Sequence, residues 1–253
     1  MANRFAGTVA VIQFPGVNCE YESASAVRSI GENAEIFRWN EDPAALDDCL
    51  GIVLPGGFSY QDRIRAGVVA AKDRVMDAVS ALARSGTPVL GICNGAQVLV
   101  EAGLIPGIHW EKVDLALAPN VMADREGYYC NWVYVRRERS NCLWTRLYGE
   151  GEVVPIPIAH AEGRFTTEDR GVLEEMKLGG QVALRYCDAA GAAVESFPVN
   201  PNGSVENIAG VCNREGNVLA LMPHPERATW LRQVPEDLGD RWAKRRRAAA
   251  GDP

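Results

Sequence analysis

In the first half of the chain, short apolar runs alternate with helix-like segments. The apolar runs cover residues 8–14, 34–39, 51–54 and 88–92. Each is apolar along its length rather than at every second position, which is typical of strands buried on both faces of a parallel sheet. Helices are predicted between them, near residues 20–30, 67–84 and 94–102. This alternation predicts an α/β fold with a mostly parallel central sheet and helices on both faces.

The second half of the chain has few long helix-like segments. Its strand-like segments cover residues 129–137, 153–158, 182–186 and 192–197. Residues 208–211 and 218–222 flank a turn-forming cluster and predict a hairpin. We therefore predict a smaller antiparallel layer beside the parallel sheet.

The end of the chain differs in composition from the rest. We predict one domain over residues 1–232 and a charged C-terminal tail over residues 233–253. The basic run at residues 244–247 is interpreted as a solvated helix end or frayed tail rather than a nucleic-acid patch.

The composition is that of an ordinary globular protein, with 47% hydrophobic and 23% charged residues. The net charge of -7 argues against a nucleic-acid partner. Seven cysteines are scattered and never spaced as C-x-x-C, and no secretory signal is evident, so we expect reduced thiols and a cytoplasmic location. No run approaches the roughly 18 apolar residues of a membrane span.

The candidate chemistry begins at Cys93, which stands between Gly91 and Gly95 where a predicted strand meets a predicted helix. Glycines at those two positions let the chain turn sharply and leave the middle residue exposed at the turn. The helix N-terminus also favours thiolate over thiol. We interpret Cys93 as a nucleophile. The alternative is a small hydrophobe buried after a strand.

A cysteine nucleophile needs a base, and the chain has only three histidines, at positions 109, 160 and 224. His224 is followed by Glu226 in a proline-stiffened segment after a predicted strand. Imidazole can take and return a proton near neutral pH, and a carboxylate can fix its tautomer. We predict a triad of Cys93, His224 and Glu226. No histidine pair has ligand spacing, so no metal site is expected.

These residues resemble the motif of the class I glutamine amidotransferases, whose Cys-His-Glu triad removes ammonia from glutamine. Five further segments are similar to the glutaminase subunits of phosphoribosylformylglycinamidine synthases, which act in de novo purine synthesis. They are residues 13–19 (QFPGVNC), 54–60 (LPGGFSY), 158–164 (IAHAEGR), 200–204 (NPNGS) and 222–227 (MPHPER). The resemblance spans about residues 8–230. It departs at Gln61, where the family often has glycine, which puts the partner contacts of that loop in doubt.

The resemblance implies a flavodoxin-like fold, L-glutamine as substrate, and a complex with an ATP-dependent synthetase subunit and a small third subunit. The ammonia would serve to convert formylglycinamide ribonucleotide to formylglycinamidine ribonucleotide. ATP and Mg²⁺ would be used by the synthetase subunit, and no cofactor is expected on this chain.

The oxyanion of an amide-hydrolysis intermediate needs preorganised donors. The candidates are the backbone N–H groups of Gly57, a bare glycine, and of Asn94, which opens the helix. Gly56 is expected to border the substrate. Because the peptide between two glycines can turn either its N–H or its C=O toward Cys93, we hypothesise that a partner selects the active state.

Three further residues are candidates for binding the substrate. Gln97 lies one helical turn from Cys93 and either hydrogen-bonds the substrate or ties the helix to a neighbouring loop. The resemblance places His160 and Glu162 at the border of the glutamine site, where lining the pocket is a better expectation for His160 than catalysis.

Two other classes of protein compete with this interpretation. Cysteine hydrolases of the intracellular-protease type share the sheet and the elbow, but they usually carry histidine where this chain has Asn94, and they do not need His224 with Glu226. A non-catalytic binding subunit would have lost a triad member, whereas all three are present.

Overall fold

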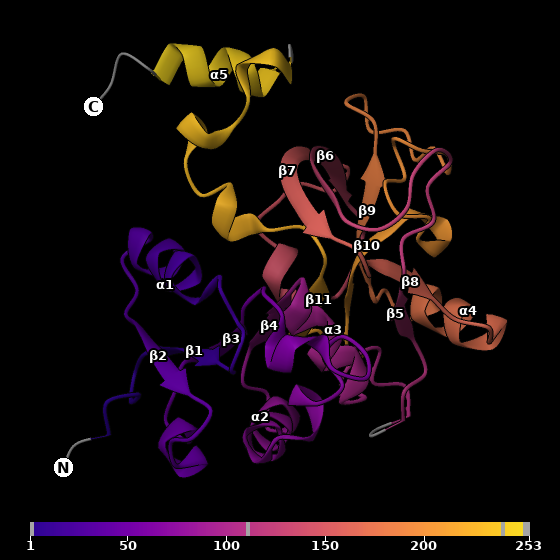
Figure 1. Cartoon of the computed structure of the whole chain (residues 1–253). Helices are drawn as coiled ribbons and strands as arrows, with labels where there is room; N and C mark the ends of the chain where they lie inside the picture. Colours follow the sequence, from indigo (N-terminus) through magenta and orange to yellow (C-terminus); the bar gives the residue numbers. More distant parts are fainter. Residues whose placement is uncertain (1–2, 110–111, 239–240, 250–253) are drawn as a thin grey trace.

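The structure is a computed structural model that describes residues 3–109, 112–238 and 241–249. The described residues form a nine-stranded sheet in the order β2-β1-β3-β4-β11-β10-β9-β6-β7 (Figure 1). The strands are β1 (Val9–Gln13), β2 (Ala34–Arg38), β3 (Gly51–Leu54), β4 (Val89–Ile92), β6 (Tyr129–Arg137), β7 (Val153–His160), β9 (Val182–Cys187), β10 (Ile208–Cys212) and β11 (Val218–Leu221). The α-helices are α1 (Glu20–Ser29), α2 (Arg74–Arg84), α3 (Asn94–Glu101), α4 (Arg170–Leu178) and α5 (Arg241–Ala249).

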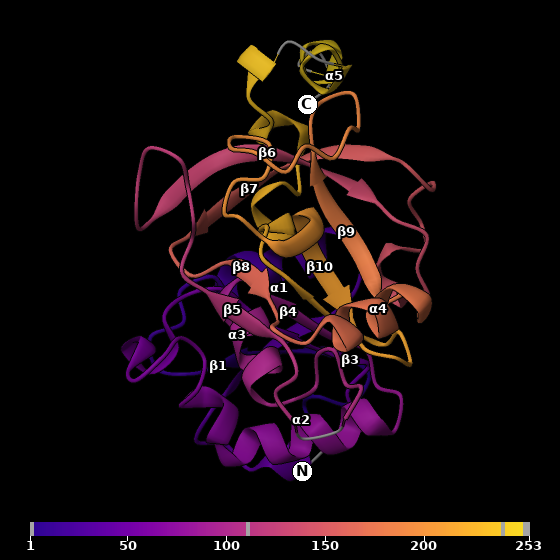
Figure 2. The same ribbon diagram turned by 90° about the vertical axis from the view of Figure 1, so that its right-hand side faces the viewer.

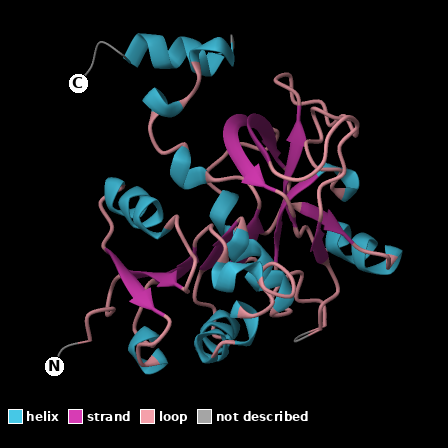
Figure 3. Cartoon of the chain, in the orientation of Figure 1, coloured by secondary structure: helices cyan, strands magenta, loops and turns pink. Residues whose placement is uncertain are grey.

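One half of the sheet is parallel and runs from β2 to β11. Every residue of β3 and β11 is buried, as in strands covered on both faces. Helices α1 and α2 lie on opposite sides of these strands (Figures 1 and 3). The predicted α/β fold, with a central parallel sheet between helices, is confirmed.

The other half of the sheet is antiparallel and continues the same sheet through β10, β9, β6 and β7. The predicted hairpin is formed by β10 and β11. Strands β6 and β7 curve across the molecule below α5 in Figure 2. A separate two-stranded sheet pairs β5 (Ala116–Ala118) with β8 (Arg164–Thr166).

The helix expected over residues 67–84 is interrupted. Residues Ala70–Lys72 form a short 3₁₀ turn, and α2 begins only at Arg74. Asp73 separates the two because its backbone is extended and its side chain accepts a hydrogen bond from the Val75 N–H over 2.9 Å. This N-cap contact starts a new helix instead of continuing the old one.

The strand expected over residues 192–197 is wrong. The segment has no regular structure, and most of it is exposed. Strand β9 precedes it and is already paired with β6 on one edge and β10 on the other, so no free edge remains beside it for this segment.

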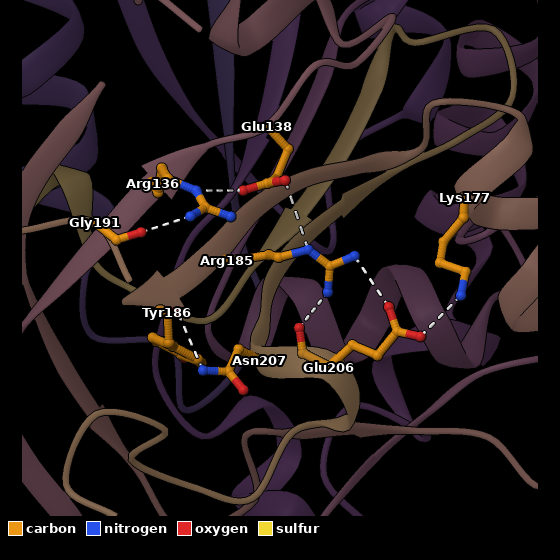
Figure 4. A network of polar contacts seen from close by, with 8 residues as sticks. All are labelled: Arg136, Glu138, Lys177, Arg185, Tyr186, Gly191, Glu206 and Asn207. Carbon is orange, nitrogen blue, oxygen red and sulfur yellow. Dashed lines mark hydrogen bonds and ion pairs between the residues drawn. The ribbon is translucent and has the colours of Figure 1, made fainter. Parts of the chain in front are cut away.

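A polar network fixes the segment that precedes β10 (Figure 4). Glu206, whose backbone is left-handed with φ 47°, accepts from Lys177 of α4 over 2.9 Å and from Arg185 of β9 over 3.1 Å. The Arg185 guanidinium also donates to the Glu206 backbone carbonyl. These contacts hold Glu206 against β9 and α4.

The C-terminal segment lies at the edge of the molecule (Figure 1). Helix α5 is attached to the start of β7, because Arg241 Nη2 donates to the Val153 carbonyl over 2.7 Å. Residues 239–240 and 250–253 of the predicted tail lie outside the described residues, and the division at residue 232 stays a prediction. Within the described part of the chain, no helix has the length and apolar character to cross a membrane.

Candidate active site

The turn between β4 and α3 has the geometry of a nucleophile elbow. Cys93 has φ 50° and ψ -106°, a conformation that non-glycine residues rarely adopt. A Cβ atom on Gly95 would come within 1.9 Å of the Leu54 carbonyl oxygen, and one on Gly91 within 2.5 Å of a Leu99 methyl group. Both glycines are therefore required for the close contacts of this turn, as predicted from their spacing.

The second predicted pair follows β11. His224 Nδ1 lies 2.6 Å from Glu226 Oε1, and both side chains are buried. Burial lowers the pKa of His224, but the sulfurs of Cys19 and Cys93 and the carboxylate of Glu226 act more strongly and raise that pKa overall. The Nε2 atom of His224 has no hydrogen-bond partner within the described chain. It is therefore free to exchange a proton with a reacting group.

Six of the nine predicted site residues line one cavity at the carboxyl edge of the parallel strands, and Gly56, Asn94 and Glu226 are not part of its lining. Its walls include Cys93, His224, Gly57 and the loop that follows β7. Strands β4 and β11 are neighbours in the sheet, which brings the elbow and the His224 segment together. Glu226 lies behind His224 and does not form part of the cavity wall.

The backbone around Gly57 and Asn94 fits the predicted oxyanion donors. Neither N–H group has a backbone acceptor among the described residues. The Gly56 carbonyl accepts from the N–H groups of Asn18 and Cys19 over 3.3 and 3.2 Å. Because a trans peptide points its C=O and N–H in opposite directions, the Gly57 N–H points away from those two residues. Gly56 itself packs against the imidazole, since a Cβ there would lie 2.7 Å from His224 Cε1.

The side chain of Gln97 ties the elbow helix to the loop after β7. Its Nε2 donates to the Glu162 carbonyl over 2.7 Å, and its Oε1 accepts from Asn94 Nδ2 over 2.9 Å. This is the structural tie that was one of two expectations for Gln97. The same side chain lines the cavity, so a contact with substrate stays a prediction.

His160 and Glu162 also line the cavity. His160 is buried, with Nδ1 at 3.1 Å from Asn120 Oδ1. Burial, and then the charge of nearby His224, lower the pKa of His160 to about 3. The ring is therefore neutral at physiological pH. His109, by contrast, pairs with Asp114 at a distance of 3.0 Å.

Cys19, Arg227 and Asp62 are among the cavity residues that were not assigned a role from the sequence. Arg227 Nη2 donates to Cys19 Sγ over 3.0 Å. Cys19 and Arg227 each lie in a segment that follows a strand end, so proximity to a strand end is the signal that could have found them. Burial, and then the nearby Glu162 carboxylate, raise the pKa of Asp62 to about 6 against the lowering effect of its hydrogen bond with Asn94.

Cys19, His224 and Glu226 are metal-ligating residue types, and their donor atoms lie within 4.8 Å of one another. The contacts of these residues favour a hydrogen-bonded group over a metal site. His224 Nδ1 and Glu226 Oε1 already bond to each other, and the cationic guanidinium of Arg227 contacts the Cys19 sulfur.

Comparison with known proteins identifies the family. Residues 6–247 match the model of the CobB/CobQ-like glutamine amidotransferase domain. The chain is 50% identical over 234 residues to phosphoribosylformylglycinamidine synthase subunit PurQ of Methanothrix thermoacetophila, covering 90% of this chain and 88% of the relative. It is 45% identical over 220 residues to the subunit of the same name from Pyrococcus furiosus, covering 87% and 88%.

Solved structures agree with this assignment. A chain of the PurLQS structure from Thermotoga maritima superposes with a TM-score of 0.71 at 33% identity, covering 96% of this chain and 97% of that one. A glutamine amidotransferase from Methylobacillus flagellatus, with 14% identity and a TM-score of 0.52, covers 98% of this chain and 76% of that one and shares the fold. The chain belongs to the CobB/CobQ-like glutamine amidotransferase family, in the group of the PurQ subunits of phosphoribosylformylglycinamidine synthase.

Proposed function

We propose that this chain is the glutaminase subunit of a phosphoribosylformylglycinamidine synthase. It hydrolyses L-glutamine to glutamate and delivers the ammonia to an ATP-dependent synthetase subunit, which converts formylglycinamide ribonucleotide to formylglycinamidine ribonucleotide in de novo purine biosynthesis. The observation that carries this proposal is that Cys93 and His224 line one cavity, with Glu226 bonded to His224 over 2.6 Å, in a chain with this family membership.

The reaction begins with attack of the Cys93 thiolate on the carboxamide carbon of glutamine. The thiol proton passes to His224 Nε2, the nitrogen that faces away from Glu226. Glu226 holds the imidazole by Nδ1 and stabilises the imidazolium, the part a carboxylate takes in such triads. The raised pKa of His224 supports an imidazolium beside the sulfur.

The carbonyl oxygen becomes an oxyanion in the tetrahedral intermediate. The Gly57 and Asn94 N–H groups are the proposed donors to this oxygen, because Gly57 lines the cavity, Asn94 directly follows Cys93, and neither N–H has a backbone acceptor among the described residues. Removing one such donor typically slows an enzyme by about 10²–10³-fold.

The intermediate collapses when His224 donates its proton to the leaving nitrogen. The carbon–nitrogen bond breaks, ammonia departs, and a γ-glutamyl thioester remains on Cys93. A water molecule, deprotonated by His224, then attacks the thioester carbon and releases glutamate with the regenerated thiol. The one imidazole acts as base and acid in turn, as general acid–base catalysis allows.

Two carboxylates of the cavity are suited to the α-ammonium group of glutamine. Asp62 and Glu162 both line the cavity and interact electrostatically with each other. A bound cation would relieve the repulsion between them, since an opposite charge favours the ionised carboxylate. Glu162 is thus assigned to substrate binding, as the resemblance implies, and Asp62 is added to it.

The proposed complex contains the synthetase subunit together with a small third subunit. The family assignment and the match to PurLQS support a synthetase partner, while the third subunit rests on the resemblance alone. ATP and Mg²⁺ are proposed to act on the synthetase, with no cofactor on this chain, and the complex is proposed to work in the cytoplasm.

The decisive experiment reconstitutes the complex with the natural chain and with Cys93→Ala. With glutamine as nitrogen source, Cys93→Ala should abolish formylglycinamidine ribonucleotide formation, with a loss of up to about 10⁶-fold as in other nucleophile units. With an ammonium salt as nitrogen source, both complexes should form product at the same rate. Glutamine-dependent synthesis by the Cys93→Ala complex would refute the proposal.

A hydrolase of the intracellular-protease type would give another result. Such a protein would cleave peptide substrates and would not supply nitrogen to the synthetase. Peptide hydrolysis without glutamine hydrolysis by the natural chain would favour that class.

A further inference from the structure

The tautomer of His160 is determined by its contacts. Asn120 Nδ2 donates to the carbonyls of His160 and Gly127 over 2.8 and 3.1 Å, while Asn120 Oδ1 accepts from the Gly163 N–H over 3.1 Å. These three bonds orient the amide, so the atom that faces His160 Nδ1 at 3.1 Å is an acceptor. Nδ1 therefore carries the proton, and Nε2 is an acceptor with no hydrogen.

The orientation of the ring is determined as well. A Cβ atom on Gly163 would come within 2.3 Å of both Cε1 and Nδ1 of His160, so the bare glycine packs directly against the imidazole. Asn202 Nδ2 donates to the Gly163 carbonyl over 2.7 Å and holds this contact in place. The ring cannot rotate without disturbing Gly163 or breaking the bond to Asn120.

The Nε2 atom of His160 is a buried hydrogen-bond acceptor without a donor among the described residues. The residue is 3% exposed, and no described residue donates to this nitrogen. The side chain lines the cavity that contains Cys93, and the preceding residue, Ala159, offers its carbonyl to the Cys93 thiol at 3.6 Å. Buried polar atoms are rarely left without a partner, so a donor from a bound molecule is the expected occupant.

Of the reacting group of glutamine, only the carboxamide nitrogen can be that donor. Its oxygen is directed to the N–H groups of Gly57 and Asn94, and its carbon to Cys93. We propose that His160 Nε2 accepts a hydrogen bond from the carboxamide –NH₂ group of glutamine and so selects substrates by their leaving nitrogen. This inference rests on the proposed function. Asn120 is the positioning residue, because it keeps the proton on the other ring nitrogen.

The proposal predicts that loss of the His160 acceptor affects hydrolysis of an amide substrate but not of an ester substrate. The γ-methyl ester of glutamate has the same carbonyl carbon and the same oxyanion as glutamine, but its leaving group has no N–H. Glutamine hydrolysis should depend on the His160 acceptor, whereas ester hydrolysis should not. The ratio of the two rates is therefore a direct readout of this hydrogen bond.

The test measures kcat/KM for both substrates in the reconstituted complex with His160→Leu, His160→Gln and Asn120→Leu. His160→Leu should lower kcat/KM for glutamine by about 10–100-fold, as expected when a buried donor loses its acceptor, with ester hydrolysis close to that of the natural complex. His160→Gln, whose amide oxygen can accept, should recover part of the glutamine rate. Asn120→Leu should lower the glutamine-to-ester ratio because Nε2 can then carry the proton. His109→Leu, a change at a histidine outside the cavity, should alter neither rate.

Equal losses for the two substrates, including loss of both through misfolding of every variant, would overturn the proposal and leave His160 a structural residue. An undiminished glutamine rate in His160→Leu would overturn it too. Failure of the proposed function has a separate signature: the natural complex would hydrolyse neither substrate, or would hydrolyse both after Cys93→Ala.

Discussion

Arg227 Nη2 and Cys19 Sγ lie 3.0 Å apart, although 208 positions separate the two residues in the sequence. The contact joins the loop after β1 to the segment after β11 and lies next to the imidazole of His224. The Cys19 sulfur is also one of the groups that raise the pKa of His224. A second thiol thus influences the proposed base without being the proposed nucleophile.

We predict that Cys19→Ala shifts the pH profile of glutamine hydrolysis. The proposed active pair is a thiolate with an imidazolium, and this pair is lost on the alkaline side when the imidazolium loses its proton. Removing a group that raises the pKa of His224 should therefore move the alkaline limb of kcat/KM to lower pH. The measurement is the pH–rate profile of the complex. Cys130→Ala, at an exposed cysteine, is the matched control and should leave the profile in place.

Labelling distinguishes the two thiols further. A glutamine-like electrophile should modify Cys93 in the natural chain and in Cys19→Ala, as read by mass spectrometry of the peptides. Modification of Cys19 in place of Cys93 would contradict the assignment of the nucleophile.

Mutation of His224 should lower the rate of glutamine hydrolysis more than mutation of Glu226. His224→Ala removes the base and should approach the effect of Cys93→Ala. Glu226→Gln keeps a hydrogen-bond acceptor near Nδ1 but loses the charge, so its rate should be higher than that of His224→Ala by about 10–100-fold, by analogy with the weaker effect of orienting carboxylates in other triads. Initial rates of glutamine hydrolysis decide this. If Glu226→Gln were as inactive as Cys93→Ala, the carboxylate would have to transfer a proton itself.

We predict that Asp62 makes glutamine binding depend on pH. Its pKa of about 6 means that the carboxylate protonates as the pH falls through that value. Because the α-ammonium group is proposed to need the ionised form, KM for glutamine should rise below about pH 6. Asp62→Asn should raise KM at neutral pH and remove this dependence. A KM that stays constant between pH 5 and 8 in the natural complex would argue against this contact.

The ionised Asp62 carboxylate also destabilises the folded protein. Since the folded-state pKa of Asp62 lies above the unfolded value of 3.8, the folded state binds the proton more tightly. Ionised Asp62 lowers the free energy of unfolding. This destabilisation is absent below the unfolded pKa of 3.8 and reaches its full size above about pH 6. Asp62→Asn should therefore raise the melting temperature at pH 8 and have little effect at pH 3.5 in a calorimetric scan.

Gly57→Ala should impair oxyanion stabilisation. Gly57 has φ 145°, and a Cβ there would lie 2.7 Å from Asn18 N and Val17 Cα, so the segment after β3 must move. Loss of one oxyanion donor predicts a fall in kcat of about 10²–10³-fold. Gly86→Ala is the matched control, because that glycine also has positive φ but open space around it. Equal kcat values for Gly57→Ala and the natural complex would exclude Gly57 as a donor.

The peptide between Gly56 and Gly57 also bears on regulation by the partner. With the Gly56 carbonyl bonded to Asn18 and Cys19, reversing this peptide costs two hydrogen bonds. If the synthetase subunit selects one orientation, its addition should raise kcat for glutamine more than it lowers KM. Full glutaminase activity of the chain alone would leave no role for such a switch.

The residues of the proposed triad could be selected from the sequence because their signals are local. Gly91 and Gly95 mark the turn around Cys93 within five residues, and His224 and Glu226 are two residues apart. Placing His224 near Cys93 was the one long-range step. It used the general rule that the carboxyl ends of parallel strands lie at one edge of the sheet. Strands β4 and β11 are parallel neighbours, as this rule requires.

The features that escaped prediction depend on contacts between distant segments. Residues 192–197 have strand-like composition, but both edges of β9 beside them are occupied by β6 and β10. The hydrogen bond between Asn120 and His160 joins residues that are 40 positions apart in the sequence. No sequence motif near either residue predicts this contact. The raised pKa of Asp62 depends on Glu162, which approaches it only in the folded chain.

The position of β11 in the sheet has a consequence for synthesis of the protein. This strand pairs with β4 on one side and β10 on the other, so the centre of the sheet stays open until residues 218–221 have been made. Cys93 leaves the ribosome long before His224, because 131 positions separate the proposed nucleophile from the proposed base in the sequence. The proposed ammonia release therefore requires that this strand of the sheet has first inserted between β4 and β10.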